Sequence, residues 1–242
     1  MKHNKVLITG GSGGIGRATI KRLTADGYQI INADRVPPKT TEPGEQFVQV
    51  DLMDWDHAKA TLADVAASGD VLRVINNAGF IRPGLLEDTT VSDFQAVVEL
   101  NLRGPLLVAQ TFLPAMRKAK FGRIINIASR AALGKELRTA YSASKAGLIG
   151  MTRTWAFEGG PDGITVNAIG PGPIATELFV SGNPPDSPKT KQIIEAIPVR
   201  RMGTPEDIAH AIASLIDDRA GFITGQVLYV CGGMTVGLSH AV

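Results

Sequence analysis

A glycine-rich run directly after the first apolar segment constrains the fold of this chain more than any other feature. The run Thr9-Gly-Gly-Ser-Gly-Gly-Ile-Gly16 follows Lys5–Thr9, which is typical of a buried strand, and a helical pattern starts within the run. Glycines let a chain turn sharply and bring backbone N–H groups and the positive end of a helix dipole against a phosphate. The spacing of Gly11, Gly13 and Gly16 fits G-x-G-x-x-G, so the sequence predicts a phosphate-binding turn between a strand and a helix.

Short apolar runs alternate with longer segments of helical period along the rest of the chain. Most of the runs are continuously apolar, as strands buried on both faces of a parallel sheet must be. We expect strands at residues 5–9, 29–33, 47–50, 71–76, 122–128, 164–169 and 226–230, and helices at 14–26, 55–66, 91–101, 105–118, 140–157 and 205–216. This order predicts an α/β fold, a Rossmann-type doubly wound parallel sheet of about seven strands with helices on both faces.

The length and composition favour one domain with one inserted segment. A chain of 242 residues with 44% hydrophobic content can enclose a single core, so we expect residues 1–242 to form one domain. Residues 172–202 interrupt the strand–helix order, and the run Ser181-Gly-Asn-Pro-Pro-Asp-Ser-Pro188 predicts exposed turns. We interpret this segment as a lid over a substrate.

Charge and hydropathy argue against several kinds of partner. The formal net charge is +2 and the basic residues are scattered, so no nucleic-acid partner is expected. No apolar stretch approaches the roughly 20 residues of a membrane-spanning helix. The apolar run that begins at Val6 leaves no room for a signal peptide, and the single cysteine, Cys231, cannot form an internal disulfide. We therefore expect a soluble, cytoplasmic protein without a membrane partner.

A carboxylate after the second predicted strand bears on the choice of dinucleotide. Asp34 lies 18 residues beyond Gly16, where it can accept hydrogen bonds from the adenosine ribose and repel a 2′-phosphate. This position favours NAD as the cofactor. The neighbouring Arg35 can pair with a 2′-phosphate, so NADP stays open.

Several separated motifs resemble those of one enzyme family. They are Thr9, Gly10, Gly14 and Gly16 for T-G-x-x-x-G-x-G, the run Asn76-Asn-Ala-Gly79, and Tyr141 with Lys145 for Y-x-x-x-K. Over essentially its whole length the chain resembles the compact, single-domain short-chain dehydrogenases/reductases, whose members are usually homotetramers. Together with the ribose position, the resemblance implies cofactor contacts from Gly10, Ser12, Gly13, Gly14, Ile15, Gly16, Asp34, Arg35, Asp51, Leu52, Asn77, Ala78, Gly79, Tyr141, Lys145, Pro171, Gly172, Ile174 and Thr176.

Four residues in the family's order form the expected catalytic set, Asn101, Ser129, Tyr141 and Lys145. A spacing of four residues places Tyr141 and Lys145 on one face of a helix. A tyrosine with a pKa of about 10 is a poor base near neutrality, and we expect the lysine ammonium and the nicotinamide charge to lower that pKa. Ser129, at the end of a predicted strand, can donate a hydrogen bond to the substrate oxygen. The resemblance gives Asn101 the role of holding a water next to the lysine.

These residues predict an NAD(P)-dependent short-chain dehydrogenase/reductase that acts on CH–OH/C=O groups. It transfers a hydride between NAD(H) and a secondary alcohol or ketone, with the tyrosine as general acid/base, and needs no metal. One alternative is an NADPH-dependent 3-oxoacyl-[acyl-carrier-protein] reductase, against which Asp34 and Asp162 weigh. A second is a non-catalytic dinucleotide sensor, against which the complete catalytic set weighs. Arg138 or Arg82 can bind a substrate carboxylate, but solvated charges explain them as well, and the sequence names no substrate.

Overall fold

The strands form one parallel sheet in the computed structural model, which describes residues 4–69, 71–184 and 186–236. The described strands are β1 (Lys5–Thr9), β2 (Gln29–Asp34), β3 (Glu45–Gln49), β4 (Arg73–Asn76), β5 (Gly122–Ile127), β6 (Ile164–Pro171) and β7 (Val227–Val230). Their order is β3-β2-β1-β4-β5-β6-β7, which confirms the predicted doubly wound sheet. The strand order reverses between β1 and β4, the point at which open α/β sheets bind ligands.

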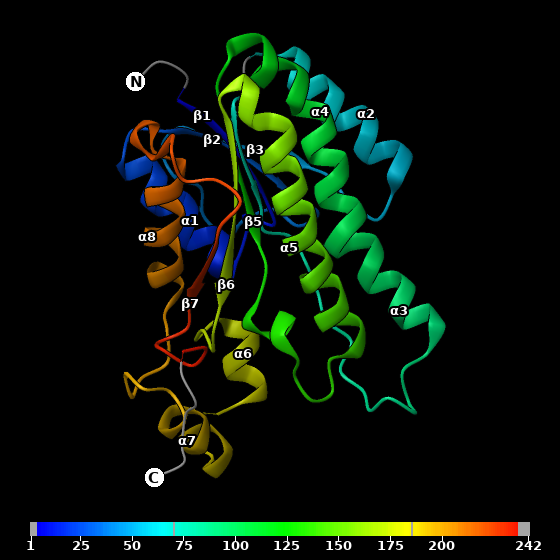
Figure 1. Cartoon of the computed structure of the whole chain (residues 1–242), viewed down its shortest axis with the longest axis vertical. Coiled ribbons are helices and arrows are strands. Elements are labelled where there is room, and N and C mark those ends of the chain that lie inside the picture. The colour runs from blue at the N-terminus through cyan, green and yellow to red at the C-terminus, as the bar shows by residue number, and fades with distance from the viewer. Residues whose placement is uncertain (1–3, 70, 185, 237–242) are drawn as a thin grey trace.

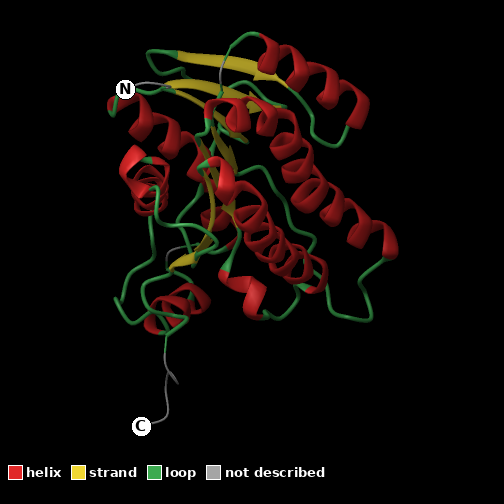
Figure 2. Cartoon of the chain, turned by 45° about the horizontal axis from the view of Figure 1, so that its top comes forward, coloured by secondary structure: helices red, strands yellow, loops and turns green. Residues whose placement is uncertain are grey.

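Two helical layers enclose the sheet (Figures 1 and 2). Helices α1 (Gly14–Ala25) and α8 (Pro205–Ile216) pack on one face, where Ile20 and Ile212 are fully buried. Helices α2 (Trp55–Ala67), α4 (Gly104–Ala119) and α5 (Thr139–Gly159) cover the other face. Among the described residues, no helix is long and apolar enough to cross a bilayer.

The third predicted helix ends earlier than the sequence pattern indicates. The pattern predicts a helix over residues 91–101, but α3 (Val91–Val98) is shorter, and a π-helical turn, Glu99–Arg103, joins it directly to α4. The wider π turn changes the direction of the side chains relative to a regular α-helix. Asn101 lies within it and is fully buried.

The inserted segment also differs from the expected turns. It contains two short helices, α6 (Glu177–Gly182) and α7 (Pro188–Glu195), which lie beyond the end of the sheet (Figure 1). Thr176 and Ser187 act as their N-caps, each accepting a backbone N–H of the first turn. The sequence did not predict these two helices, because they are too short to show a clear apolar periodicity and the segment is rich in proline. A role for residues 172–202 as a lid stays a prediction.

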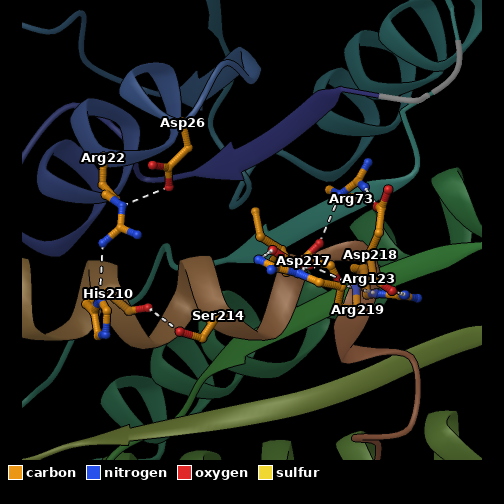
Figure 3. A network of polar contacts seen from close by, with 10 residues as sticks. Arg22, Asp26, Arg73, Arg123, His210, Ser214, Asp217, Asp218 and Arg219 are labelled. Carbon is orange, nitrogen blue, oxygen red and sulfur yellow. Dashed lines mark hydrogen bonds and ion pairs between the residues drawn. The ribbon is translucent and has the colours of Figure 1, made fainter. Parts of the chain in front are cut away.

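Two buried arginines lie at the amino-terminal ends of β4 and β5 and bind the segment that follows α8 (Figure 3). Arg73 of β4 has no exposed surface, donates to the carbonyl of Ile216 at 3.1 Å, and forms an ion pair with Asp218. Arg123 of β5 donates to the carbonyl oxygens of Asp217 at 3.3 Å and Asp218 at 3.0 Å. These bonds attach the end of α8 to the sheet.

Candidate active site

The glycine turn has a shape that only glycine permits at its closest contacts. Gly10 has a φ of +66°, and a Cβ on Gly16 would lie 2.1 Å from the carbonyl oxygen of Gly10. The Asn77 amide donates to the carbonyl oxygens of Thr9 at 3.0 Å and Gly10 at 2.8 Å. Thr9 Oγ1 in turn accepts the N–H groups of Asn77 and Ala78, each at 3.0 Å. The end of β4 therefore fixes the turn after β1.

The N-terminus of α1 is open to an anion. Gly13 is its N-cap and offers no side-chain hydrogen bond, and the first turn, which includes Ile15, contains no acidic residue. By contrast, Thr204 and Asp207 form a complete capping box on α8. A Cβ on Gly13 would meet nothing within 4 Å. Uncapped N–H groups beside open space fit the pyrophosphate of a dinucleotide.

Asp34 lies against the glycine turn. It ends β2, and its carboxylate accepts the N–H of Ser12 at 3.0 Å and that of Val36 at 3.2 Å. The first bond connects the acidic side chain to the phosphate-binding turn across 22 residues of sequence. A ribose placed next to a pyrophosphate at Ser12 therefore lies within reach of this carboxylate.

A cavity of about 520 Å³ opens beside Asp34, a size suited to part of a small-molecule ligand. It is lined by Arg35, Val36, Gln49, Asp51 and His57. The predicted Arg35 and Asp51 thus share one cavity, and Leu52 is buried next to Asp51 in the chain. His57 was not predicted to face this cavity, because a lone histidine on a helix gives no signal until the fold is known.

Ser129 and Tyr141 meet through their hydroxyl groups. Ser129 follows β5 and caps the short helix η2 (Arg130–Leu133), its Oγ accepting the N–H of Ala131 at 3.1 Å. Tyr141 lies in the first turn of α5, close enough to Ser129 for the serine hydroxyl to lower the tyrosine pKa against the effect of burial. Two hydroxyls from separate elements therefore converge at the carboxyl end of β5.

Lys145 and Asn101 both lie close to Gly79. Lys145 is buried, donates to the carbonyl of Ile127 at 2.7 Å, and lies 5.6 Å from the centre of the Tyr141 ring. A Cβ on Gly79 would lie 2.9 Å from Asn101 Oδ1 and 3.4 Å from Lys145 Nζ. The structure thus brings the four predicted catalytic residues into one cluster with the N-N-A-G segment.

The Asn101 side chain is occupied by the protein itself. Its Nδ2 donates to Phe80 O at 3.1 Å and to Ser144 Oγ at 3.0 Å, and its Oδ1 accepts the N–H of Phe80 at 3.1 Å. Both amide hydrogens are used, so only the amide oxygen retains capacity for a further hydrogen bond. The role of holding a water stays a prediction.

Burial governs the protonation of Tyr141 and Lys145. Burial raises the pKa of Tyr141, while the Ser129 hydrogen bond and the positive charge of Arg138 oppose this rise. Burial also lowers the pKa of Lys145 to about 8. The sequence predicts that the lysine charge lowers the tyrosine pKa, but among the protein's own groups the cation with that effect is Arg138.

The first residues of the inserted segment lie against the site. Pro171 is the last residue of β6, and a Cβ on Gly172 would lie 2.7 Å from Cys231 Cα. Ile174 is buried. The methyl group of Thr176 lies 3.4 Å from the position that a Cβ on Gly14 would take. The segment therefore reaches the phosphate-binding turn.

The fold and site together define a Rossmann-type oxidoreductase that uses a nicotinamide dinucleotide. A short-chain dehydrogenase family model, described as enoyl-(acyl carrier protein) reductase, matches residues 10–235. The (2S)-[(R)-hydroxy(phenyl)methyl]succinyl-CoA dehydrogenase subunit BbsD of Thauera aromatica is 36% identical over 98% of both chains. The 3-oxoacyl-[acyl-carrier-protein] reductase of Synechocystis is 38% identical over 95% of this chain and 96% of its own.

A solved structure supports the same assignment. The structure of ElxO with NADP bound has a TM-score of 0.90 and 30% sequence identity, covering 96% of this chain and 98% of its own. The chain belongs to the short-chain dehydrogenase/reductase family. It is an NAD(P)-dependent oxidoreductase that transfers a hydride between the cofactor and a CH–OH/C=O pair.

Proposed function

We propose that the protein interconverts a secondary alcohol and a ketone with NAD(H), and that Tyr141 exchanges the proton with the substrate oxygen. The closeness of Ser129 to Tyr141, which lowers the tyrosine pKa against the effect of burial, carries this proposal together with the position of Lys145 beside the Tyr141 ring. Both hydroxyls can reach one oxygen atom at the carboxyl end of β5, beside the reversal in strand order. The proposed substrate is a small molecule.

A bound nicotinamide supplies or accepts the hydride. In reduction, Ser129 donates a hydrogen bond to the carbonyl oxygen and Tyr141 gives that oxygen its proton. The raised pKa of Tyr141 keeps the phenol protonated at neutral pH, which suits this direction. In oxidation the phenol must first lose its proton, so alkaline pH favours that direction.

Lys145 and Asn101 hold the site in this mechanism. The pKa of Lys145, lowered to about 8 by burial, lets its ammonium exchange a proton near neutral pH. Its Nζ is fixed by Ile127 O close to Gly79, where we place the nicotinamide ribose. Asn101 positions the tyrosine helix through Ser144.

Different residues are proposed to bind the different parts of the dinucleotide. The N–H groups of the Gly10–Gly16 turn bind the pyrophosphate, Asp34 accepts from the adenosine ribose, and Asp51 contacts the adenine. The remaining proposed contacts come from Arg35, Leu52, Asn77, Ala78, Gly79, Tyr141, Lys145, Pro171, Gly172, Ile174 and Thr176. The position of Asp34 favours NAD over NADP, because its carboxylate repels a 2′-phosphate.

Separate fluorescence titrations with NADH and NADPH, followed by assays on a panel of secondary alcohols and ketones, test this proposal. We expect NADH to bind at least about tenfold more tightly, the effect of a charged hydrogen-bond acceptor. Tighter NADPH binding would show that Arg35 dominates and would favour a carrier-protein reductase. Tight binding without turnover of any member of the panel would favour a sensor.

A 3-oxoacyl-[acyl-carrier-protein] reductase is the second candidate, favoured by the name of the Synechocystis relative. Asp162 weighs against it, because it pairs with Lys120 and, at 3.3 Å, with Arg117. Several such reductases meet their acidic partner at the position of Lys120, and here Asp162 neutralises the charge of that lysine. Titration with an acyl carrier protein distinguishes the two candidates, because only tight binding would favour the carrier-protein reductase.

We also propose a cytoplasmic homotetramer. We expect α5 and β7 to form the interfaces between subunits, and two phenylalanines near them are largely or fully exposed. They are Phe157 of α5 at 86% and Phe222 before β7 at 102%. Leu228 of β7 is exposed as well. Exposed large apolar side chains mark association surfaces. Sedimentation at micromolar concentration tests this, and a monomer would overturn it.

A further inference from the structure

A buried carboxylate of β3 is saturated with hydrogen bonds. The Glu45 side chain has no exposed surface. Its Oε2 accepts Arg17 Nη2 at 2.7 Å and the N–H of Glu42 at 2.8 Å, and its Oε1 accepts Arg17 Nη1 and Asn32 Nδ2, each at 2.9 Å. Burial raises the pKa of Glu45, but the bonds that it accepts lower that pKa below its ordinary value. Glu45 is therefore a fixed, charged acceptor whose capacity of about four hydrogen bonds is filled.

The charge of Glu45 fixes the orientation of the Asn32 amide in β2. Asn32 is fully buried. Because a carboxylate accepts hydrogen bonds and donates none, the Nδ2 side of the amide must face Glu45, and its second hydrogen is donated to Ser12 Oγ at 3.3 Å. Among the described residues nothing donates to Asn32 Oδ1, which would lie 2.3 Å from a Cβ on Gly11. An unpaired buried oxygen destabilises a fold, so packing alone does not account for an asparagine here.

Ser12 of the glycine turn receives two bonds from one face of β2. Asn32 and Asp34 are two residues apart, so their side chains lie on the same face of the strand. Asn32 donates to the Ser12 hydroxyl oxygen, and the Asp34 carboxylate accepts the Ser12 N–H at 3.0 Å. These are the hydrogen bonds of Ser12 within the described part of the chain, and neither uses the hydroxyl hydrogen. That hydrogen is available to a ligand at the phosphate-binding turn.

We propose that Asn32 and Glu45 are positioning residues for the cofactor. Glu45 orients the Asn32 amide, and the amide turns the Ser12 hydroxyl so that its hydrogen is donated to a phosphate oxygen of the dinucleotide. The inference rests on the proposed function, which places the pyrophosphate at the glycine turn. The N–H groups of the turn and the serine O–H then bind the same anion. Arg17 pairs with Glu45 through both of its terminal nitrogens, so the buried carboxylate does not repel the phosphates.

A double-mutant cycle tests the proposal by calorimetric titration with ADP-ribose, which carries the pyrophosphate but lacks the nicotinamide. Ser12→Ala removes the hydroxyl, and Asn32→Leu removes the amide at similar size. We expect each variant to bind ADP-ribose at least about fivefold more weakly, as for the loss of a hydrogen bond to a charged group. The double variant should bind within about twofold of Ser12→Ala, because Asn32 acts through Ser12. Independent effects would multiply to about 25-fold or more and would overturn the inference.

Two controls separate positioning from a loss of structure. Adenosine carries no phosphate and should bind all four proteins of the cycle within about twofold. Asn167→Leu also removes a fully buried asparagine, whose Nδ2 donates to Ile223 O at 2.7 Å and whose Oδ1 accepts the N–H of Gln226 at 3.1 Å. It should lower the melting temperature and leave the affinity for ADP-ribose unchanged. Equal losses for adenosine and ADP-ribose in Asn32→Leu would overturn the inference.

Glu45→Gln tests the same relay without changing Asn32. A glutamine amide presents either a donor or an acceptor, so the Asn32 amide is free to turn its oxygen toward Ser12 and take the hydroxyl hydrogen itself. We expect Glu45→Gln to weaken ADP-ribose binding, and to add nothing in the Ser12→Ala background. Equal losses in both backgrounds would overturn the inference, as would a loss in Gly13→Ala without any in Ser12→Ala. The expected cycle without turnover of any substrate would contradict the proposed function alone.

Discussion

Lys145 Nζ donates to the carbonyl oxygen of Ile127 at 2.7 Å, inside a site that lowers the lysine pKa to about 8. The unfolded chain holds this proton up to a pKa of about 10.4. Between these two pKa values the unfolded state binds more protons, so the free energy of unfolding rises with pH. The buried ammonium thus destabilises the fold at neutral pH, and the effect fades above pH 8.

Lys145→Met removes this titration. We expect its free energy of unfolding, relative to that of the unaltered protein, to fall by roughly 2–3 kcal/mol between pH 7 and pH 10. Urea unfolding of both proteins at the two pH values measures the change. A difference in stability that is independent of pH would contradict the lowered pKa.

Alanine substitutions at Gly13 and Gly16 separate the folding role of the glycine turn from its binding role. Gly13→Ala should leave the melting temperature unchanged, because its Cβ meets nothing within 4 Å, but should weaken NADH binding by about tenfold or more where the pyrophosphate lies. Gly16→Ala should destabilise the fold itself, since its Cβ would lie 2.1 Å from Gly10 O. Thermal melting and NADH titration measure both effects. Unchanged NADH affinity in Gly13→Ala would place the pyrophosphate elsewhere.

The carboxylate of Asp34 sets the cofactor preference in this account. Asp34→Asn keeps the side-chain size but removes the negative charge. That charge strengthens the hydrogen bonds from the ribose and repels a 2′-phosphate. The ratio of kcat/KM for NADH to that for NADPH should fall about tenfold or more. Asp51→Asn, in the cavity that Arg35 also lines, should lower both values without changing their ratio. An unaltered ratio in Asp34→Asn would assign the preference to other residues.

Arg73, at the amino-terminal end of β4, stabilises the side of the sheet that lies far from the site. Arg73→Ala should lower the free energy of unfolding by about 3–5 kcal/mol, because it removes a buried guanidinium and its bonds to Ile216 and Asp218. Asp218→Asn should cost less than about 1 kcal/mol, since that side chain is 52% exposed. Chemical unfolding measures both. Equal costs would show that the ion pair, rather than the buried arginine, dominates.

The sequence located those parts of the molecule that depend on local pattern. Strand β1 and helix α8 have the predicted bounds, and the glycine turn and the Tyr141–Lys145 pair lie where their spacing indicated. The π turn was missed because apolar periodicity does not reveal one wider turn between two continuous helices. Burial of Arg73 was also missed, since a charged residue at a strand start is ordinarily exposed. Its aromatic and carbonyl partners come together only in the folded chain.

The charges around the catalytic residues could not be predicted from the sequence either. Arg138 was a candidate for binding a carboxylate, but only the fold shows its charge acting on Tyr141. Clusters that draw on separate elements leave no pattern in sequence.

The central claim is that Tyr141 transfers the proton, and Tyr141→Phe tests it most directly. The variant removes one hydroxyl from a buried ring and leaves the proposed dinucleotide contacts in the glycine turn intact. We expect NADH to bind within about twofold of the unaltered affinity and kcat to fall by at least about 100-fold, the usual contribution of general acid–base catalysis. Both values come from one protein preparation, by NADH fluorescence and by steady-state turnover of the best substrate. Unchanged turnover with intact binding would contradict the account.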